Sequence, residues 1–298
     1  MNLPSHKRFD YNAIHDRPPL VWPGGKKLAV YISVCVEHFA FNEGRGLSYS
    51  PGLDHPNTYN WAWREYGNRV GGWRLVELAK RHGVPLTVLL NTACYAHCPD
   101  LVKALKGADG EIVAHGRTNS ENQNGMSVEA ERALILEVTE HIREIEGEAP
   151  LGWMSPGANP SVQTEDLLQE AGYRYTMDWP MDDQPVWIRA GDHGRGHLLS
   201  MPYPHEVNDV PAIALHHMTA DAFMQMTFDN LDQLLEDSDQ QSLVMGVTLH
   251  TFIMGQPFRR RRLGAFFEHL AAHSGDIWLT TAGEIAAAFE SQFPAKAG

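Results

Sequence analysis

The chain has 298 residues, of which 43% are hydrophobic, so it can bury the core of one barrel-sized domain or of two small ones. Its 24 basic and 37 acidic side chains give a formal net charge of −13. This balance argues against a nucleic-acid partner or an anionic membrane surface, because phosphate binding needs clustered Lys and Arg. The basic run Arg259 to Arg262 is short and local, and it favours a solvated helix start over a phosphate site.

The lack of a recognisable targeting signal and the low cysteine count predict a cytoplasmic protein. No apolar run approaches the roughly 20 residues that span a bilayer, and the N-terminal stretch has no apolar signal-peptide core, so we expect a cytoplasmic location. Three cysteines are too few for a disulfide framework, which suits a reducing compartment. Cys94 and Cys98 lie four residues apart with His97 between them. This spacing allows a metal site but favours buried thiols on a helix.

Residues 1–25 predict an irregular N-terminal arm, and residues 26–298 predict a single catalytic domain. The run 27–36 is rich in apolar and β-branched residues without sustained alternation, which is typical of a buried parallel strand. Glycine stops and helical spacing divide the remainder. Further strands are expected at 84–90, 111–114, 173–177, 198–202, 212–215, 243–249 and 276–280, a strand end at 152–157, and helices at 71–82, 99–105, 127–145, 164–171, 219–235, 263–273 and 282–289.

Residues 42–66 contain Gly, Pro, Asn and aromatic residues without clear periodicity, and they predict an aromatic-rich loop. Such a loop can pack within the fold, mediate contact between subunits or cover a ligand pocket. Trp61 and Trp63 are its most prominent side chains. Packing or an interface is the favoured interpretation.

Strands alternate with helices over the whole length, and no linker interrupts them. This order predicts a parallel α/β fold, and at this size a closed but distorted (β/α) barrel is favoured over an open sheet. The carboxyl ends of the strands in such a barrel open on one face, where active sites are built.

Polar residues follow four predicted strands. They are Glu37-His38, His115 with Asn119 in the motif His-Gly-Arg-Thr-Asn, Asp182-Asp183, and His250. Each has an ordinary explanation alone, since a single histidine is often a hydrogen-bonded structural residue and an Asp pair often belongs to a turn or a helix cap. Their shared position after apolar strands predicts that they meet at one site.

These residues resemble the polysaccharide deacetylase family. That family has a Thr-Phe-Asp-Asp-Gly motif after its first strand, followed by His-Ser-x-x-His, Arg-x-Pro-x-Gly, an Asp-Trp/Tyr-rich motif and Leu-x-x-His. The order and rough spacing match from about Leu28 to Phe289. The pattern is most similar to a cytoplasmic branch that includes metal-independent allantoinases and cyclic-imide hydrolases, with Glu-His, His-Gly-x-Thr-Asn and Asp-Asp-x-Pro. The resemblance implies a distorted (β/α) barrel of seven or eight strands.

The resemblance also implies roles for individual residues. Glu37 falls on the family's general base and His250 on the general acid that protonates the leaving nitrogen. His38 falls on the second aspartate, a metal ligand, and His115 on the first metal histidine. Asn119 replaces the second metal histidine. In addition, Met154 stands where the family has an arginine that orients the base.

Neutral asparagine is a weak metal ligand, so a site of His38, His115 and Asn119 would hold zinc poorly. We therefore expect either that no metal is required or that a divalent metal such as zinc is weakly held. His115 and Asn119 would then hold the oxyanion directly or through that metal. Asp182 or Asp183 would orient His250 or bind substrate, and Asp183 is the expected third catalytic residue. The expected substrate-binding residues are Asn119, Trp153, Trp179 and Asp182.

The resemblance implies hydrolysis of a carbon–nitrogen bond other than a peptide bond. A small cyclic amide, imide or ureide is the favoured substrate because a cytoplasmic protein does not meet cell-wall polymers and the aromatic segments suit a small pocket. N-deacetylation of acetylated amino sugars or oligosaccharides is the alternative, since aromatic side chains also stack on sugar rings. A non-catalytic binding protein is a third possibility, but a pure binder would not need both Glu37 and His250. We also expect a homo-oligomer.

Overall fold

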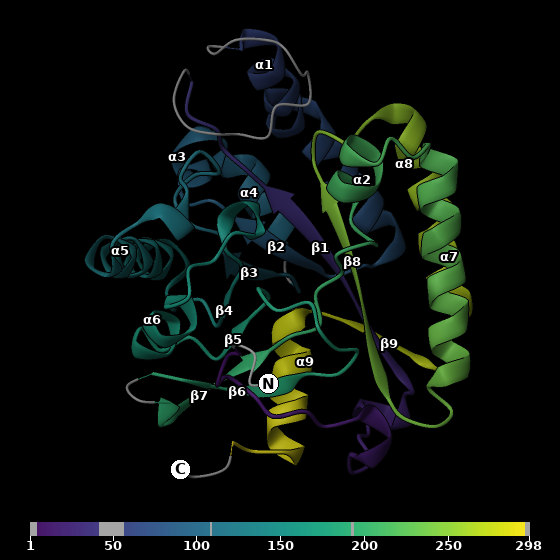
Figure 1. The fold of residues 1–298 in the computed structure, drawn as a ribbon. Helices are drawn as coiled ribbons and strands as arrows, with labels where there is room; N and C mark the ends of the chain where they lie inside the picture. Colours follow the sequence, from purple (N-terminus) through teal and green to yellow (C-terminus); the bar gives the residue numbers. More distant parts are fainter. Residues whose placement is uncertain (1–4, 42–56, 108, 192–193, 296–298) are drawn as a thin grey trace.

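The computed structural model describes residues 5–41, 57–107, 109–191 and 194–295. These residues form one curled sheet covered by helices (Figure 1). The strands within them are β1 (Leu28–Val36), β2 (Leu86–Leu90), β3 (Glu111–Ala114), β4 (Gly152–Trp153), β5 (Tyr175–Thr176), β6 (Val186–Ala190), β7 (Gly196–Ser200), β8 (Leu243–His250) and β9 (Ile277–Thr280).

The sheet follows the order β6-β7-β5-β4-β3-β2-β1-β8, and β9 pairs with the first half of β1. All neighbours are parallel except β6 and β7, which form an antiparallel pair. Between β8 and the β6 end of the sheet, an isolated bridge joins Asn208 to Thr248. The result is the expected distorted (β/α) barrel, which is open on one side and carries one antiparallel edge strand.

Both faces of the sheet are buried, and the two faces carry different residues. Along β1, alternate residues from Leu28 to Val36 join one apolar cluster, whereas Ala29, Tyr31 and Cys35 join a second one. This alternation follows from the period of two in a strand. The second cluster lies on the concave side, which is the barrel interior, and the first lies beneath the outer helices. Burial of every residue of β1 explains its continuous apolar sequence.

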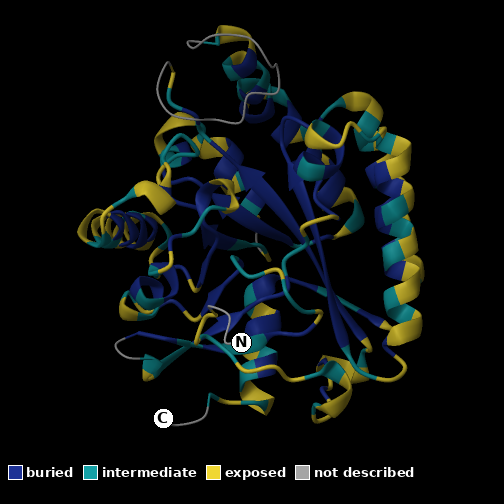
Figure 2. Cartoon of the chain, viewed as in Figure 1, coloured by how far each residue is buried: buried dark blue, intermediate teal, exposed yellow. Residues whose placement is uncertain are grey.

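Most of the helices cover the outer face of the sheet, and their inward sides are buried (Figures 1 and 2). One helix, α9, packs its apolar residues into the interior cluster instead. The α-helices of the described residues are α1 (Thr58–Tyr66), α2 (Gly72–His82), α3 (Cys94–His97), α4 (Pro99–Lys106), α5 (Val128–Glu146), α6 (Thr164–Glu170), α7 (Ala220–Asp237), α8 (Pro257–Ala272) and α9 (Ala282–Gln292).

Two predicted elements differ from the structure, and one strand of the structure was not predicted. Residues 57–66 were expected to be loop but form the helix α1, capped by Asn57; residues 42–56 of that prediction lie outside the described part. The expected strand at 212–215 is wrong, because Val210–Leu215 is a π-helix, η7. The edge strand β6 was not predicted.

The N-terminal arm lies along the barrel. Trp22 is buried and its Nε1 donates to the carbonyl of Leu243, at the start of β8. Further out, Arg17 pairs with Asp182 at 2.5 Å. These contacts tie the arm to the end of the barrel opposite the carboxyl ends of the strands.

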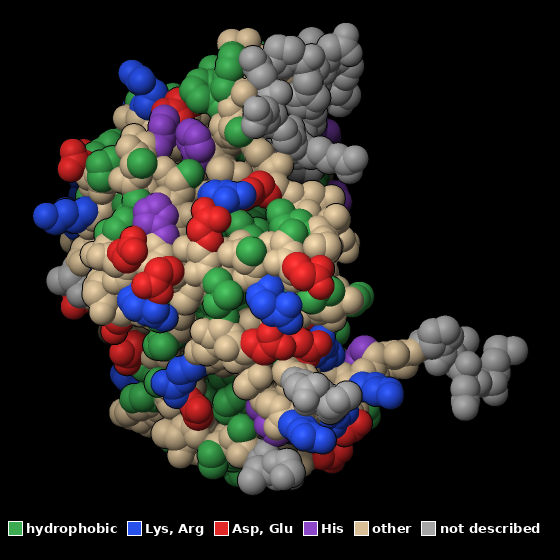
Figure 3. Space-filling view, turned by 90° about the vertical axis from the view of Figure 1, so that its left-hand side faces the viewer, with side chains coloured by type: hydrophobic (Ala, Val, Ile, Leu, Met, Phe, Trp, Pro, Cys, Tyr) green, Lys and Arg blue, Asp and Glu red, His purple; other side chains and the backbone are tan. Residues whose placement is uncertain are grey.

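Acidic and basic side chains are interspersed on the face shown in Figure 3. Many are paired, as Arg117 is with Glu137 at 2.9 Å. The basic run Arg259–Arg262 lies in the first turns of α8, where Arg260 pairs with Glu77 and Arg262 with Asp221. Among the helices that the structure describes, none combines the length and the apolar character needed to cross a bilayer.

Candidate active site

The carboxyl ends of β1, β2, β3 and β8 are aligned by their pairing. Val36 is opposite Leu90, Leu90 is opposite Ala114, and Cys35 is opposite His250. The next residues are therefore neighbours at this edge of the barrel. By the same alternation that separates the two apolar clusters, Glu37, Asn91, His115 and His250 face the interior. The predicted meeting of Glu37, His115 and His250 is thus a consequence of register.

Glu37 is at the centre of this group. Its Oε1 accepts a hydrogen bond of 2.5 Å from Asn119 Nδ2. The same oxygen lies 3.5 Å from His250 Nε2 and 3.6 Å from His115 Nε2. The two longer distances exceed a normal hydrogen bond. They place two ring nitrogens around one carboxylate oxygen without a tight direct bond.

Asp209 orients His250. One oxygen of Asp209 is 2.7 Å from His250 Nδ1, and the other accepts the His250 backbone N–H at 2.8 Å. Because a carboxylate only accepts, Nδ1 carries a proton and Nε2 faces Glu37. Asp209 is fully buried and immediately precedes η7, so the π-helix places it against the end of β8.

A backbone carbonyl orients His115 in the same way. His115 Nδ1 donates to the Met154 carbonyl at 2.7 Å, which directs Nε2 toward Glu37. The next residue, Ser155, is held by the carboxylate of Asp178, which accepts from its N–H at 2.8 Å and from its Oγ at 2.7 Å. Thus Met154 acts through its backbone at this position.

Two asparagines fix the backbone around the site. Asn91 accepts from the His38 N–H at 3.0 Å, and its Nδ2 donates to the His115 carbonyl and to Asn119 Oδ1. Asn68 donates to the Glu37 carbonyl at 2.9 Å from η3 (Gly67–Gly71), also a π-helix. Glycine is required in η3, since a Cβ on Gly71 would lie 2.1 Å from the Thr251 carbonyl oxygen.

The electrostatics separate the charge states of the two proton-transfer candidates. Burial raises the pKa of Glu37, but His250 and His115 beside it outweigh burial and hold that pKa well below its usual range. Burial lowers the pKa of His250, but Cys35, Asp209 and Glu37 together raise it well above the ordinary value. At neutral pH the arrangement therefore favours an ionised Glu37 next to a protonated His250.

The structure corrects the expected roles of Asp182 and Asp183. Neither orients His250, because Asp209 makes that contact. Asp182 pairs with Arg17 instead. The Asp183 carbonyl accepts from Val244 N–H at the start of β8, six residues before His250. At about 3.3 Å per residue, this places Asp183 roughly 20 Å from the end of the strand.

The two tryptophans predicted to bind substrate also lie elsewhere. Trp153 is fully buried in the outer core, where its ring packs against Tyr173 and its Nε1 donates to Ser155 Oγ at 3.1 Å. Trp179 donates to Glu165 at 2.6 Å and packs against Phe9 of the N-terminal arm. These contacts assign both rings to packing. By contrast, Asn119 contacts Glu37 directly.

The expected metal ligands do not fit a common metal. His38 follows Glu37 and therefore points to the other side of the chain; it groups with Glu65 and His97. Asn119 uses both side-chain atoms in hydrogen bonds, donating to Glu37 and accepting from Asn91. His115 Nε2 is directed at Glu37. We therefore assign no catalytic step to a metal held by His38, His115 and Asn119.

Cys35 lies beside the proton-transfer group, whereas Cys94 and Cys98 are hydrogen-bonded neighbours, and Cys98 is only part-buried, contrary to the expected buried thiol. Cys35 is 2% exposed below Glu37, and its donor atom lies within 4.8 Å of those of Glu37 and His250. Burial raises the pKa of its thiol. Cys94 is buried and donates to the Val36 carbonyl, as expected for a thiol on a helix.

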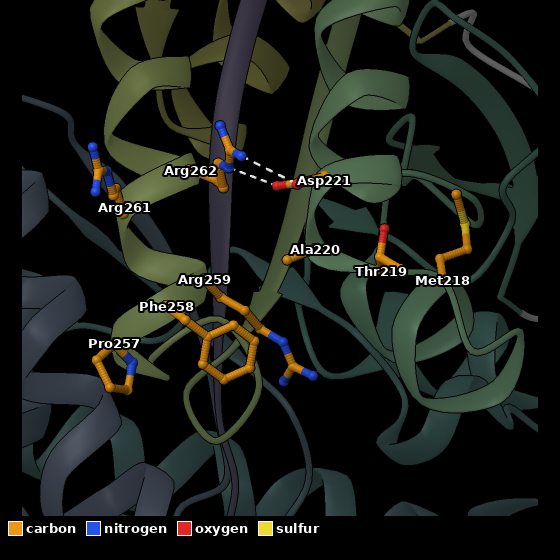
Figure 4. A pocket seen from close by; sticks show the side chains of 9 residues that line it. All are labelled: Met218, Thr219, Ala220, Asp221, Pro257, Phe258, Arg259, Arg261 and Arg262. Carbon is orange, nitrogen blue, oxygen red and sulfur yellow. Dashed lines mark hydrogen bonds and ion pairs between the residues drawn. The ribbon is translucent and has the colours of Figure 1, made fainter.

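Two hollows lie near the carboxyl end of β8. One of about 1030 Å³ is formed by the start of α8 and the residues before α7, and an ion pair between Arg262 and Asp221 crosses it (Figure 4). The other, of about 300 Å³, lies between α1, η7 and the turn after β8; it is lined by Tyr59, Asn60, Trp63, Ile213, Ala214, His217, Ile253 and Arg259. Neither lining includes Glu37, but the smaller hollow borders the elements that carry Asp209 and His250.

The chain is similar in sequence to known proteins. The model of the polysaccharide deacetylase family matches residues 65–176. A putative polysaccharide deacetylase of Schizosaccharomyces pombe is 29% identical over 78% of this chain and 77% of its own length. A peptidoglycan deacetylase of Helicobacter pylori is 25% identical over 78% of this chain and 87% of its own length.

A similar fold occurs in a solved structure, that of Puue allantoinase. The two superpose with a TM-score of 0.84 at 25% identity, over 97% of this chain and 100% of that one. The fold, the order of the strand-end residues and the sequence matches agree: the chain is similar to polysaccharide deacetylases, whose family model matches residues 65–176.

Proposed function

We propose that this protein is an amidohydrolase that cleaves a carbon–nitrogen bond other than a peptide bond, in a small cyclic amide, imide or ureide. The observation that carries the proposal is the placement of two anchored imidazoles around one Glu37 oxygen. Hydrolysis of an amide needs a base for water, a donor for the oxyanion and an acid for the leaving nitrogen. The described residues supply all three.

In this mechanism Glu37 takes a proton from water while the water oxygen attacks the carbonyl carbon. Asn119 Nδ2 has a second N–H for the oxyanion, and the His115 ring donates from Nε2 when it carries a proton there as well as on Nδ1. The carbon–nitrogen bond then breaks as His250 gives its Nε2 proton to the nitrogen, and Asp209 stabilises the imidazolium before that transfer. The opposed pKa directions of Glu37 and His250 match these roles.

The dimensions of the site support a small substrate. Glu37 is 8% exposed, His250 7% and His115 3%, so only a small group can reach all three. The adjacent hollow of about 300 Å³ is of the size that encloses small molecules. Arg259, at its edge, offers a positive charge to a carboxylate or carbonyl of the substrate.

N-deacetylation of an acetylated amino sugar is the second candidate. It is supported by the names of the two curated relatives, which are a putative polysaccharide deacetylase and a peptidoglycan deacetylase. The allantoinase neighbour supports the cyclic ureide instead. Incubation with hydantoin, succinimide, allantoin and N-acetylglucosamine oligomers distinguishes them. Turnover of the oligomers alone would reverse the ranking, and tight calorimetric binding without turnover would favour a binding protein.

Glu37→Gln and His250→Ala test the mechanism. Removal of a general acid or base costs about 10²- to 10⁴-fold in rate, so both variants should lose turnover on that scale. Glu111→Gln and His269→Ala are matched controls. Glu111 is a part-buried glutamate at the start of β3, and His269 pairs with Asp232 at 2.7 Å on the surface. Normal turnover by either active-site variant would refute the assignment.

We also propose that the protein forms a homo-oligomer through the aromatic surface around α1. Tyr59 is 77% exposed and Phe41 50% exposed, and Phe41 packs edge-on against Trp61. Exposed aromatic residues are enriched at protein interfaces. Light scattering should give a mass above that of one chain, and Tyr59→Ser should lower it. A monomer at all concentrations would contradict this.

A further inference from the structure

Two imidazoles and a carboxylate meet beside the candidate active site, outside the proton-transfer group. His38 follows β1, Glu65 lies near the end of α1, and His97 is the last residue of α3. One ligand atom from each lies within 4.8 Å of the others. Three separate elements thus converge on one point, and the hydrolytic mechanism uses none of these side chains.

The contacts within this cluster leave one ring nitrogen, His38 Nδ1, without a hydrogen-bond partner among the described residues. His97 Nε2 lies 2.8 and 2.9 Å from the two Glu65 oxygens, and the rings of His38 and His97 have centroids 4.5 Å apart. His38 Nδ1 is also buried. A buried, unpaired ring nitrogen is costly unless a partner binds it.

Neighbouring amides hold the cluster in place. Asn68 Nδ2 donates to the Glu37 carbonyl at 2.9 Å and lies 3.5 Å from Glu65 Oε2, which is longer than a normal hydrogen bond. Asn91 accepts from the His38 backbone at 3.0 Å. Contacts of this kind orient metal ligands in proteins and raise the affinity of the site.

We propose that His38, Glu65 and His97 form a binding site for a divalent cation of the zinc class. Two imidazoles and one carboxylate are a usual ligand set for zinc sites with an open position. Tetrahedral bonds of about 2.0 to 2.1 Å separate two ligand atoms by roughly 3.3 Å. His97 and Glu65 would need to move apart by only a few tenths of an ångström for the cation to replace the proton between them.

The exposure of the ligands allows the cation to enter. The side chains of His97 and Glu65 are 32% and 14% exposed, so solvent reaches the cluster. The site differs from the one that the family resemblance implied, since it keeps His38 but replaces His115 and Asn119. The proposed cation site is tested by metal binding, so the result does not depend on the proposed hydrolysis.

A second group with similar donors provides a matched control. Asp232, His269 and His273 also place ligand atoms within 4.8 Å of one another, across α7 and α8. His269 and Asp232 are already paired at 2.7 Å, and their side chains are 27% and 55% exposed. This pair resembles His97–Glu65 but has no buried unpaired nitrogen beside it in the described residues.

The experiment uses the full chain, stripped with a chelator and exchanged into metal-free buffer. Co²⁺ is titrated while its visible d–d absorption is followed, and Zn²⁺ is then titrated calorimetrically. We expect one site per chain whose Zn²⁺ affinity falls at least about tenfold in His97→Ala and in Glu65→Gln, and stays unchanged in His269→Ala. His97 is exposed, and Glu65→Gln keeps the shape of the side chain, so at least one variant should fold.

The proposal is overturned if the native protein binds neither cation, or if His97→Ala and Glu65→Gln bind as tightly as the native protein. Loss of binding in His269→Ala would also overturn it. Circular dichroism of each variant shows that a loss of binding is not a loss of fold. A fall in affinity in only one of the two ligand variants, with the other fully folded and unchanged, would also contradict the three-ligand site.

Discussion

Asp209 controls how firmly His250 holds its proton, so Asp209→Asn tests the candidate site most directly. The native carboxylate accepts two hydrogen bonds, from Nδ1 and from the backbone N–H of His250. Asparagine has nearly the same shape but only one acceptor oxygen. Its amide group must therefore face one of these two N–H donors, or the imidazole must shift its proton from Nδ1 to Nε2.

The magnitude follows from the change in the bond. A hydrogen bond to a charged group contributes about 1.5–3 kcal/mol and a neutral one about 0.5–1.5 kcal/mol, so the imidazolium loses roughly 1–1.5 kcal/mol of stabilisation. At 1.36 kcal/mol per pKa unit, the pKa of His250 falls by about one unit or more. In the shifted tautomer the neutral ring is a poor acid, and the rate falls by about 10²- to 10⁴-fold.

The assay is kcat/KM as a function of pH on the substrate found in the screen. The native pKa of His250 is raised, so the acid is lost only as pH rises above the ordinary histidine value. In Asp209→Asn the alkaline limb should move to lower pH. Titration of the imidazole by NMR gives the same shift without substrate. Asp182→Asn is the control, since Asp182 pairs with Arg17. An unchanged limb and an unchanged rate would refute this account.

Two further predictions concern carboxylates. Asn119→Asp replaces the amide that donates to Glu37 with a second negative charge, so the pKa of Glu37 should rise. The acid limb of the kcat/KM profile should therefore move to higher pH. An unchanged acid limb would contradict the contact between Asn119 and Glu37. Burial raises the pKa of Glu111 to about 7, although Tyr175 and Gly283 donate to it at 2.6 and 2.8 Å. Because the unfolded chain loses this proton first, near pH 4.5, the free energy of unfolding should fall by about 3 kcal/mol as pH rises to about 7. Glu111→Gln should remove that part of the pH dependence in urea unfolding curves, and parallel curves for variant and native protein would refute it.

The sequence by itself determined the barrel and the strand ends that form the site. The apolar strands at 28–36, 86–90 and 243–250 are fully buried, and their composition alone predicts this. Glu37 and His115 directly follow strands, and His250 is the last residue of one. Parallel pairing of these strands therefore brings the three residues to the same edge of the sheet, independently of how the helices pack. The period of two in a strand also directs Glu37 and His38 to opposite sides of the chain.

Only the tertiary structure decided which acid orients His250. Asp209 lies 41 residues before it, and η7, which was expected to be a strand, carries the carboxylate to the end of β8. Asp182 and Asp183 had the better sequence context, since they follow a predicted strand. The chain instead brings Asp183 to the start of β8, where its carbonyl accepts from the Val244 N–H, and Asp182 pairs with Arg17 of the N-terminal arm. Position along a strand is local information, whereas the partner of a side chain depends on how distant segments pack.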